Sequence, residues 1–204
     1  VSYAFAHGGG LHLVGNLLFL WLVGCNLEDR WGRAAFGAFY LVGAIGAALS
    51  FRLLHPGSDT LLIGASGAIA AAMGAFLVNF YDAEIRFAYV WLTIPPRWGT
   101  FEARAMFAMP VWFLQDLASA WLHEAKGNAQ VAYSAHVGGF LLGVGIAVAL
   151  RVSGIEKKHL LPAASKGVEW AEDPEVLRAL DLVGRGQPAE AIPLLRAVLQ
   201  RTPR

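Results

Sequence analysis

The chain has 204 residues, of which 56% are hydrophobic and only 15% are charged, and its formal net charge is +1. Because ordinary soluble domains carry about 25% charged residues, this composition argues against a soluble protein, and the balanced charge gives no indication of nucleic-acid binding. The single cysteine, Cys25, excludes an intrachain disulfide. Residues 153–204 hold 15 of the 31 charged side chains, so the first three quarters of the chain is typical of a membrane protein.

Five apolar segments approach the roughly 20 residues that a helix needs to cross the hydrocarbon core of a bilayer. They cover residues 11–27, 34–51, 61–81, 105–122 and 129–150. We therefore predict an all-α bundle of membrane-spanning helices. Residues 82–104 alternate weakly, contain Pro95 and Pro96 and are rich in aromatic residues, which predicts a short interfacial hairpin instead of a sixth span. The sequence begins at Val1 in a half-apolar stretch without a signal-peptide pattern, so we expect that an upstream part is missing.

The distribution of Lys and Arg among the loops predicts the orientation of the bundle. One end would carry only Arg52 and Lys126. The other end would carry Arg30, Arg33, Arg86, Arg97, Arg104, Arg151, Lys157 and Lys158. We expect this second end and the C-terminal tail to lie in the cytoplasm, and the small loops suggest a bacterial cytoplasmic membrane.

Four polar side chains would then share one depth near the outer ends of their spans: His12, Asn16, Ser66 and His136. Polar residues inside a span are costly and usually face the bundle interior or a wet cavity. An imidazole within reach of a serine hydroxyl makes it a nucleophile. His12 and Asn16, four residues apart on one helix face, carry N–H donors suited to a developing oxyanion, as do the backbone N–H groups at the start of the Ser66 helix.

Small residues predict how the helices that carry Ser66 and His136 approach each other. They are Gly67, Ala71 and Gly74 on the first helix and Gly139 and Gly143 on the second. Faces of this kind allow close helix packing in a membrane, which would bring the outer ends of both helices together.

Three motifs occur in order on three different predicted spans. They are "HGGGLHLVGN" with His7, His12 and Asn16, "GASG" at residues 64–67 and "AHVGG" at residues 135–139. Together with the charged turn "LEDRWG", they resemble the rhomboid intramembrane serine proteases over about residues 3–150. The resemblance implies a bundle of six core helices, so that one more span would lie upstream.

The resemblance also implies a catalytic dyad of Ser66 and His136, an oxyanion hole lined by His12 and Asn16, and a supporting role for His7 in the outer loop. No metal or organic cofactor is implied. Transmembrane protein substrates would enter from the lipid bilayer past residues 105–122, a mobile lateral gate.

One position departs from the pattern of the family, which often has an aromatic residue one turn after the serine. Ala70 takes that place here, and Tyr133 is a candidate substitute.

Each of these roles has an alternative. Ser66 could be an ordinary packing residue, and the other polar side chains could be interhelical hydrogen bonders. Three histidines (His7, His12 and His136) could bind zinc, although the chain has no His-Glu-x-x-His motif. The alternative function is a non-proteolytic rhomboid-like protein that binds membrane helices. Asp116 would either contact substrate at the gate or reach interfacial water.

The pattern of apolar residues in the C-terminal segment predicts two short helices, similar to a single tetratricopeptide unit. The apolar stripes are Val176, Leu177, Leu180 and Val183 on one helix and Ala191, Ile192, Leu195, Val198 and Leu199 on the other. We therefore divide the chain into a rhomboid-like membrane domain (1–151), a linker (152–173) and a helix-turn-helix tail (174–204). One such unit cannot bury its own faces, so we expect it to dock on the membrane domain, to bind a protein partner or to begin an array; the alternative is a loosely ordered tail.

Overall fold

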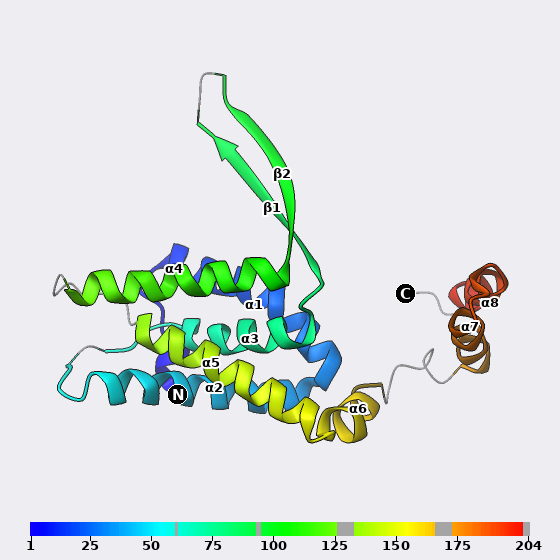
Figure 1. Ribbon diagram of the computed structural model, residues 1–204, viewed down its shortest axis with the longest axis horizontal. Helices are drawn as coiled ribbons and strands as arrows, with labels where there is room; N and C mark the ends of the chain where they lie inside the picture. Colours follow the sequence, from blue (N-terminus) through cyan, green and yellow to red (C-terminus); the bar gives the residue numbers. More distant parts are fainter. Residues whose placement is uncertain (60, 93–94, 126–132, 166–172, 202–204) are drawn as a thin grey trace.

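The computed structural model describes residues 1–59, 61–92, 95–125, 133–165 and 173–201. Its main body is a bundle of helices, which confirms the predicted all-α fold class. The helices are α1 (Gly10–Trp31), α2 (Arg33–Leu54), α3 (Ser66–Asn79), α4 (Ala105–Ala125) and α5 (Tyr133–Val152). They lie side by side with α3 among the others (Figure 1). Short helical turns flank the bundle: η1 (Ser2–Phe5) precedes α1, and η2 (Glu156–Leu160) and α6 (Leu161–Ser165) follow α5.

Within the described residues, α1, α2 and α5 are long and apolar enough to cross a membrane. Many of their large apolar side chains are exposed, such as Leu11, Leu18 and Leu49, as expected for a surface that faces lipid. This surface and the apolar composition identify an integral membrane protein.

Helix α3 is shorter than the span predicted at residues 61–81, so that prediction of a full-length span was wrong. It has 14 residues and is therefore about 21 Å long, less than the roughly 30 Å of a hydrocarbon core. Residues 61–65 form a loop before the helix. Gly64 adopts a φ of 113°, which is incompatible with a right-handed helix, so α3 begins only at Ser66. Ser66 is thus the first residue of a helix whose start is set back from the ends of α2 and α4 (Figure 1).

The predicted small-residue contact between α3 and α5 is present. A methyl group at Gly139 would overlap the carbonyl oxygen of Gly67, and one at Gly143 would overlap the carbonyl oxygen of Ala71. Residues 67–76 of α3 are all buried. The two backbones therefore touch directly, as small residues permit in membrane bundles.

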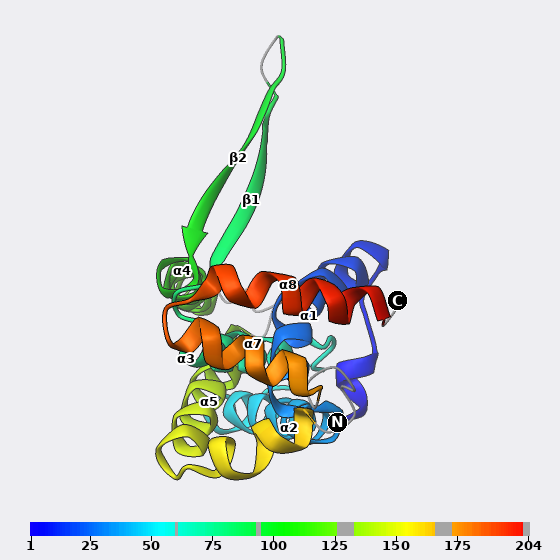
Figure 2. The ribbon, with the colours of Figure 1, turned by 90° about the vertical axis from the view of Figure 1, so that its right-hand side faces the viewer.

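Residues 82–104 contain the predicted hairpin. Strands β1 (Glu84–Trp91) and β2 (Arg97–Arg104) pair in antiparallel register, with Phe87 opposite Phe101. The hairpin runs crosswise to the helices and extends beyond the bundle in both views (Figures 1 and 2).

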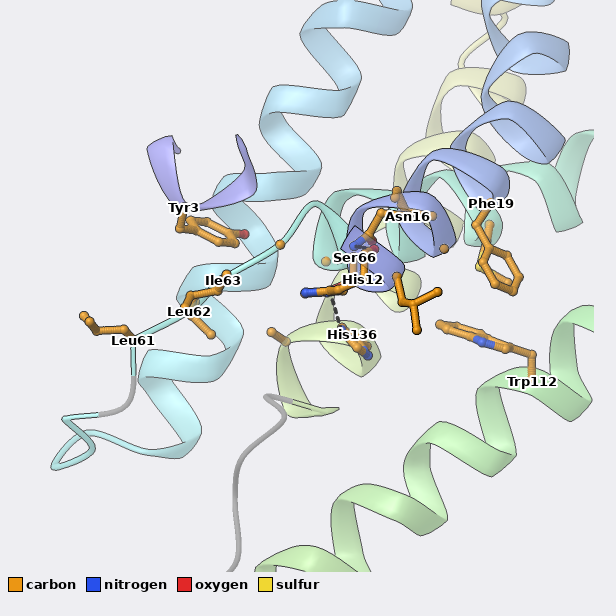
Figure 3. Close-up of a pocket in the computed structure, with 17 residues that line it drawn as sticks. Tyr3, His12, Asn16, Phe19, Leu61, Leu62, Ile63, Ser66, Trp112 and His136 are labelled. Atoms are coloured by element: carbon orange, nitrogen blue, oxygen red, sulfur yellow. Dashed lines mark hydrogen bonds between the residues drawn. The ribbon is translucent and has the colours of Figure 1, made fainter. Parts of the chain in front are cut away.

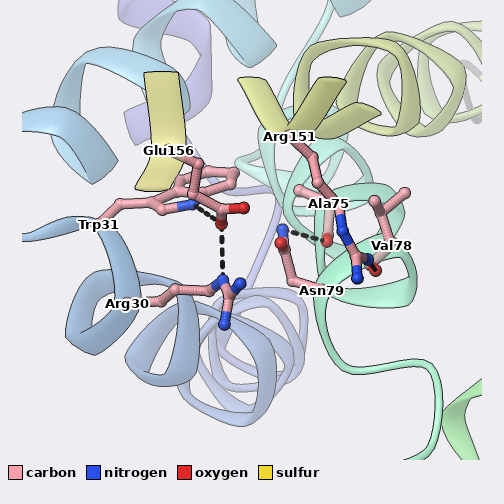
Figure 4. Close-up of polar contacts among 7 residues, drawn as sticks. All are labelled: Arg30, Trp31, Ala75, Val78, Asn79, Arg151 and Glu156. Atoms are coloured by element: carbon pink, nitrogen blue, oxygen red, sulfur yellow. Dashed lines mark hydrogen bonds and ion pairs between the residues drawn. The ribbon is translucent and has the colours of Figure 1, made fainter. Parts of the chain in front are cut away.

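A buried carboxylate ties the segment after α5 to the end of α1 (Figure 4). Glu156 is 4% exposed, and its Oε1 accepts hydrogen bonds from Arg30 Nε at 2.6 Å and from Trp31 Nε1 at 2.8 Å. Burial alone would raise the pKa of Glu156, but these hydrogen bonds and the charges of Arg30 and Arg151 outweigh it and lower the pKa.

The C-terminal segment forms two packed helices, α7 (Pro174–Gly184) and α8 (Pro188–Arg201). Asp173 caps α7, because its Oδ1 accepts a hydrogen bond from the N–H of Glu175 at 2.8 Å. Val176, Ala179, Ala191 and Val198 are buried between the helices. Leu177, Leu180, Ile192 and Leu199 of the predicted stripes remain exposed. The predicted stripes therefore bury only part of their apolar surface within this pair of helices.

Candidate active site

The centre of the site is a direct contact between α3 and α5. Ser66 Oγ and His136 Nε2 lie 2.7 Å apart, and both side chains are half-buried (Figure 3). A neutral imidazole that carries its proton on Nδ1 accepts this hydrogen bond from the serine hydroxyl. The geometry is the one that a serine nucleophile and its general base require.

The sequence brings these two groups together through the glycine contact described above. Gly67 directly follows Ser66, and Gly139 lies one turn after His136 on the same helix. Since Gly139 rests on the carbonyl of Gly67, the side chains of Ser66 and His136 project from neighbouring first turns. A larger residue at Gly139 would separate the backbones and with them the two side chains.

His12 and Asn16 line the same cavity from the first turns of α1. The backbone N–H of Gly8 donates to His12 Nδ1 at 3.3 Å, so that in the neutral ring the proton lies on Nε2. The Asn16 side-chain amide donates one hydrogen bond to the His12 carbonyl oxygen at 2.9 Å, which fixes the rotamer and leaves its second N–H. Both residues can therefore present an N–H donor to the cavity.

Gly64 is a residue of the site whose role the sequence did not reveal beyond its place in the motif. Its φ of 113° is unfavourable for any other residue. A methyl group there would lie 2.8 Å from His12 Cε1 and 2.9 Å from His12 Nε2. Gly64 thus lets the loop before α3 pass directly against the imidazole. The only signal in the sequence was a glycine just before the serine helix.

Tyr3 was also missed, and it holds this loop in place. Its carbonyl oxygen accepts the N–H of Gly64 at 3.0 Å, while its hydroxyl donates to the Ala44 carbonyl oxygen on α2 at 2.6 Å. No sequence pattern marks Tyr3, because both contacts join residues that are far apart in the chain.

The site opens into a cavity of about 500 Å³. Its polar end carries His12, Asn16, Ser66 and His136, and the remaining wall is largely apolar. Apolar side chains come from α1 (Phe19), the loop before α3 (Leu61, Leu62, Ile63), α3 itself (Ile69, Met73) and α4 (Trp112). Phe19 and Trp112 lie on the side away from Tyr3 (Figure 3). The cavity is therefore suited to an apolar ligand that carries a polar group at the Ser66 end.

His7 lies beside this cavity instead of within its wall. Its ring meets that of His12 edge-on with 5.4 Å between centroids. It lines a second cavity of about 590 Å³ between α1 and α2, and its buried Nε2 has no hydrogen-bond partner among the described residues. His7 therefore contacts the ring of His12 but does not line the cavity of Ser66.

Tyr133, the candidate substitute for the absent aromatic residue, lies beside His136. Its ring meets that of His136 edge-on with 6.1 Å between centroids, while Ala70 is fully buried in α3. The side chain of Asp116 lies outside the described residues.

The described part of the chain offers no set of ligands for the zinc site considered as an alternative. Among the described residues, no group of three His, Cys, Asp or Glu side chains is placed to hold a metal ion. His12 and His136 face the Ser66 cavity, but His7 does not line it.

Comparison with known proteins places this arrangement in a family. Residues 1–153 match the Rhomboid domain family. The chain is 31% identical to Rhomboid protease GlpG of Klebsiella pneumoniae over 149 residues, which are 72% of this chain and 46% of that protein. It is 30% identical to Rhomboid-like protease 3 of Toxoplasma gondii over 146 residues, 72% of this chain and 49% of that protein.

A plant protein is similar as well. RHOMBOID-like protein 5 of Arabidopsis thaliana is 28% identical over 145 residues, 70% of this chain and 40% of that protein. The chain thus spans less than half the length of these relatives. It belongs to the rhomboid family, a family of membrane proteins that includes intramembrane proteases.

Proposed function

We propose that the chain is an intramembrane serine endopeptidase in which Ser66 is the nucleophile and His136 the general base. The observation that carries this proposal is the 2.7 Å contact between Ser66 Oγ and His136 Nε2 at the end of a largely apolar cavity. A buried serine without a base would be only a packing residue, whereas an imidazole at this distance can take the hydroxyl proton.

The reaction would proceed in two stages. His136 Nε2 takes the Ser66 proton while Oγ attacks the carbonyl carbon of the scissile peptide, and the carbonyl oxygen becomes an oxyanion. The imidazolium then gives the proton to the leaving amine, and the C–N bond breaks to leave an acyl-serine. Water, deprotonated by the same imidazole, attacks the ester and releases the carboxylic acid, and the proton returns to Ser66.

Three kinds of donor would stabilise the oxyanion. His12 offers its Nε2–H because Gly8 occupies Nδ1, and Asn16 offers the amide N–H that its own helix does not use. The backbone N–H of Ser66 lies at the start of α3, where the first N–H groups have no acceptor within the helix. Donors fixed in a site with little water stabilise a developing charge strongly.

The substrate would be a membrane-spanning or membrane-proximal segment of another protein. In a helix each carbonyl is already hydrogen-bonded, so the segment must unwind locally before Ser66 can reach a peptide bond. Small and helix-destabilising residues are therefore the expected preference. Helix α4 would form the entry side, since Trp112 from α4 lines the cavity.

A fluorophosphonate probe tests this proposal, because it forms a covalent bond only with an activated serine. We expect the full chain in detergent to be labelled and both Ser66→Ala and His136→Ala to lose labelling. Ser50→Ala is the matched control, because Ser50 is another half-buried serine whose hydroxyl donates to its own helix at Gly46. Undiminished labelling of Ser66→Ala would refute the nucleophile assignment. A folded chain that takes up no probe but binds membrane helices would support the non-proteolytic alternative.

We also propose that the chain contains a membrane domain (1–151), a linker (152–173) and a helical tail (174–204) that lies in the cytoplasm of a bacterium. The first part of this linker, residues 156–165, is helical and packs on α1. The exposed Leu177, Leu180 and Ile192 of α7 and α8 support docking of a protein partner on this tail. Cysteine placed in the tail should react with an impermeant maleimide only after intact cells are opened; labelling of intact cells would reverse the orientation.

A further inference from the structure

The β1–β2 hairpin has two different faces. On one face, Arg86 forms an ion pair with Glu102 at 2.7 Å, and Glu84 lies opposite Arg104. The other face carries residues that alternate with these: Ile85, Phe87, Tyr89 and Trp91 on β1 and Phe101 on β2. Phe87 and Phe101 stack across the strands with 5.1 Å between ring centroids. Because successive side chains point to opposite sides of a strand, the hairpin is amphipathic.

The apolar face begins as part of the bundle core. Ile85 is only 6% exposed and Phe87 packs against the same core, so at its base this face is turned toward the bundle. Farther out the face is uncovered: Phe101 is 54% and Trp91 is 65% exposed. Near the turn both faces are apolar: Leu92 is 91% exposed, and Trp98, which lies on the same face as Arg86, is 75% exposed.

The direction of the hairpin determines what can cover this face. The hairpin leaves the end of the bundle where α3 ends and α4 begins, and it runs crosswise to the helices (Figures 1 and 2). Its strands of eight residues reach about 27 Å. Since the helices cross the bilayer, a hairpin crosswise to them at one end lies along the bilayer surface, beside the bundle.

The exposed residues suit that surface. Trp and Tyr concentrate at the level of lipid headgroups, where one part of the ring is in contact with chains and the other with water. Arg97 lies opposite Trp91 and has no ion-pair partner among the described residues, so its charge can meet a lipid phosphate. Exposed apolar side chains also occur on α4, the helix that follows β2, at Phe107 and Val111.

We propose that the β1–β2 hairpin is an interfacial membrane anchor. Its aromatic face and its tip, including Trp98, dock on the leaflet at the end of the bundle opposite Ser66, while the Arg86–Glu102 pair nearer the base remains in water. β2 passes into α4 without a linker, and the N–H groups of Ala105 and Met106 donate to Ala83 and Tyr81 at 2.8 Å each. A hairpin held at the surface therefore also holds the first turn of α4. This proposal does not depend on proteolysis.

The test compares positions on opposite faces of the hairpin. The background is the full chain with Cys25→Ser, and single cysteines are introduced by Phe101→Cys, Trp91→Cys or the control Thr100→Cys. Each variant is labelled with the fluorophore NBD and is then reconstituted in phosphatidylcholine–phosphatidylglycerol vesicles. Thr100 is an exposed residue next to Phe101 but on the other face. We expect nitroxide lipids labelled near the headgroup to quench positions 91 and 101 at least threefold more than position 100, and aqueous iodide to show the reverse order.

Two outcomes would overturn the proposal. Equal iodide quenching at all three positions would place the hairpin in water. Protection from both quenchers that grows with the protein-to-lipid ratio would mean that a second copy of the chain, not lipid, covers the face. Tyr89→Cys reports on the same face if Trp91→Cys does not fold, and replacement of phosphatidylglycerol by phosphatidylcholine separates the contribution of Arg97 from that of the aromatic rings.

Discussion

The hydroxyl of Ser66 and the imidazole of His136 are in hydrogen-bond contact although 70 positions separate them in the chain. The contact depends on two helices whose backbones touch at glycine, and not on any local motif. Changes to the helix contact should therefore affect the chemistry as strongly as changes to the reactive groups.

Gly143→Ala should weaken both folding and probe labelling. The added methyl group would overlap the carbonyl oxygen of Ala71, and overpacking of this kind costs about 1–3 kcal/mol. Gly145→Ala is the matched control, because its added methyl group meets nothing within 4 Å on the same helix. Thermal unfolding in detergent and fluorophosphonate labelling would measure the effect. Equal behaviour of the two variants would show that α3 and α5 are not in close contact.

Asn16→Ala should slow cleavage of a model transmembrane substrate by about 100-fold, the usual loss for one oxyanion donor. Labelling by the probe should persist, because Ser66 and His136 are unchanged. Asn26→Ala is the control: Asn26 is on the same helix, and its amide donates to Leu22 four residues earlier, as that of Asn16 does to His12. A turnover equal to that of the control would remove Asn16 from the oxyanion hole.

Gly64→Ala should abolish labelling even though no reactive group is altered. The alanine would be strained at a φ of 113°, and its methyl group would press on the His12 ring. Gly57→Ala provides the comparison, since that loop glycine has open space around its Cα. The readout is the labelling rate at matched amounts of folded protein; retention of the wild-type rate would show that the loop before α3 can move without loss of the site.

Glu156→Gln should lower the free energy of unfolding. Breaking a buried ion pair typically costs about 3–5 kcal/mol, and we expect the lower end of this range because the side chain of Arg30 is 28% exposed and keeps some solvation. Glu28→Gln should cost less than about 1 kcal/mol, because the Arg33–Glu28 pair is at the surface. Denaturant titration in detergent measures both. Equal losses would mean that the Glu156 contact does not hold the end of α1.

The same carboxylate predicts how stability depends on pH. The native pKa of Glu156 is lowered, so its contribution is fully present above the pKa of the unfolded chain, about 4.3, and is lost as the pH falls through the native pKa. The stabilisation that Glu156 gives the wild type should thus be present and independent of pH near neutral pH, and it should decline below about pH 4. Stability curves against pH for the wild type and Glu156→Gln should converge in acid; parallel curves would contradict the assignment.

The sequence by itself determined the membrane class, the order of the helices and the pair of small-residue faces, because hydropathy and spacing along one helix are local properties. It also singled out Ser66, His136, His12 and Asn16, because polar groups are rare in such segments. Only the tertiary structure decided that α3 begins at Ser66, that Gly64 passes against His12, that Tyr3 secures the loop, and that the hairpin lies crosswise to the bundle. These features depend on contacts between residues that are distant in the chain. The pattern of residues within one segment does not indicate which distant residue will contact it.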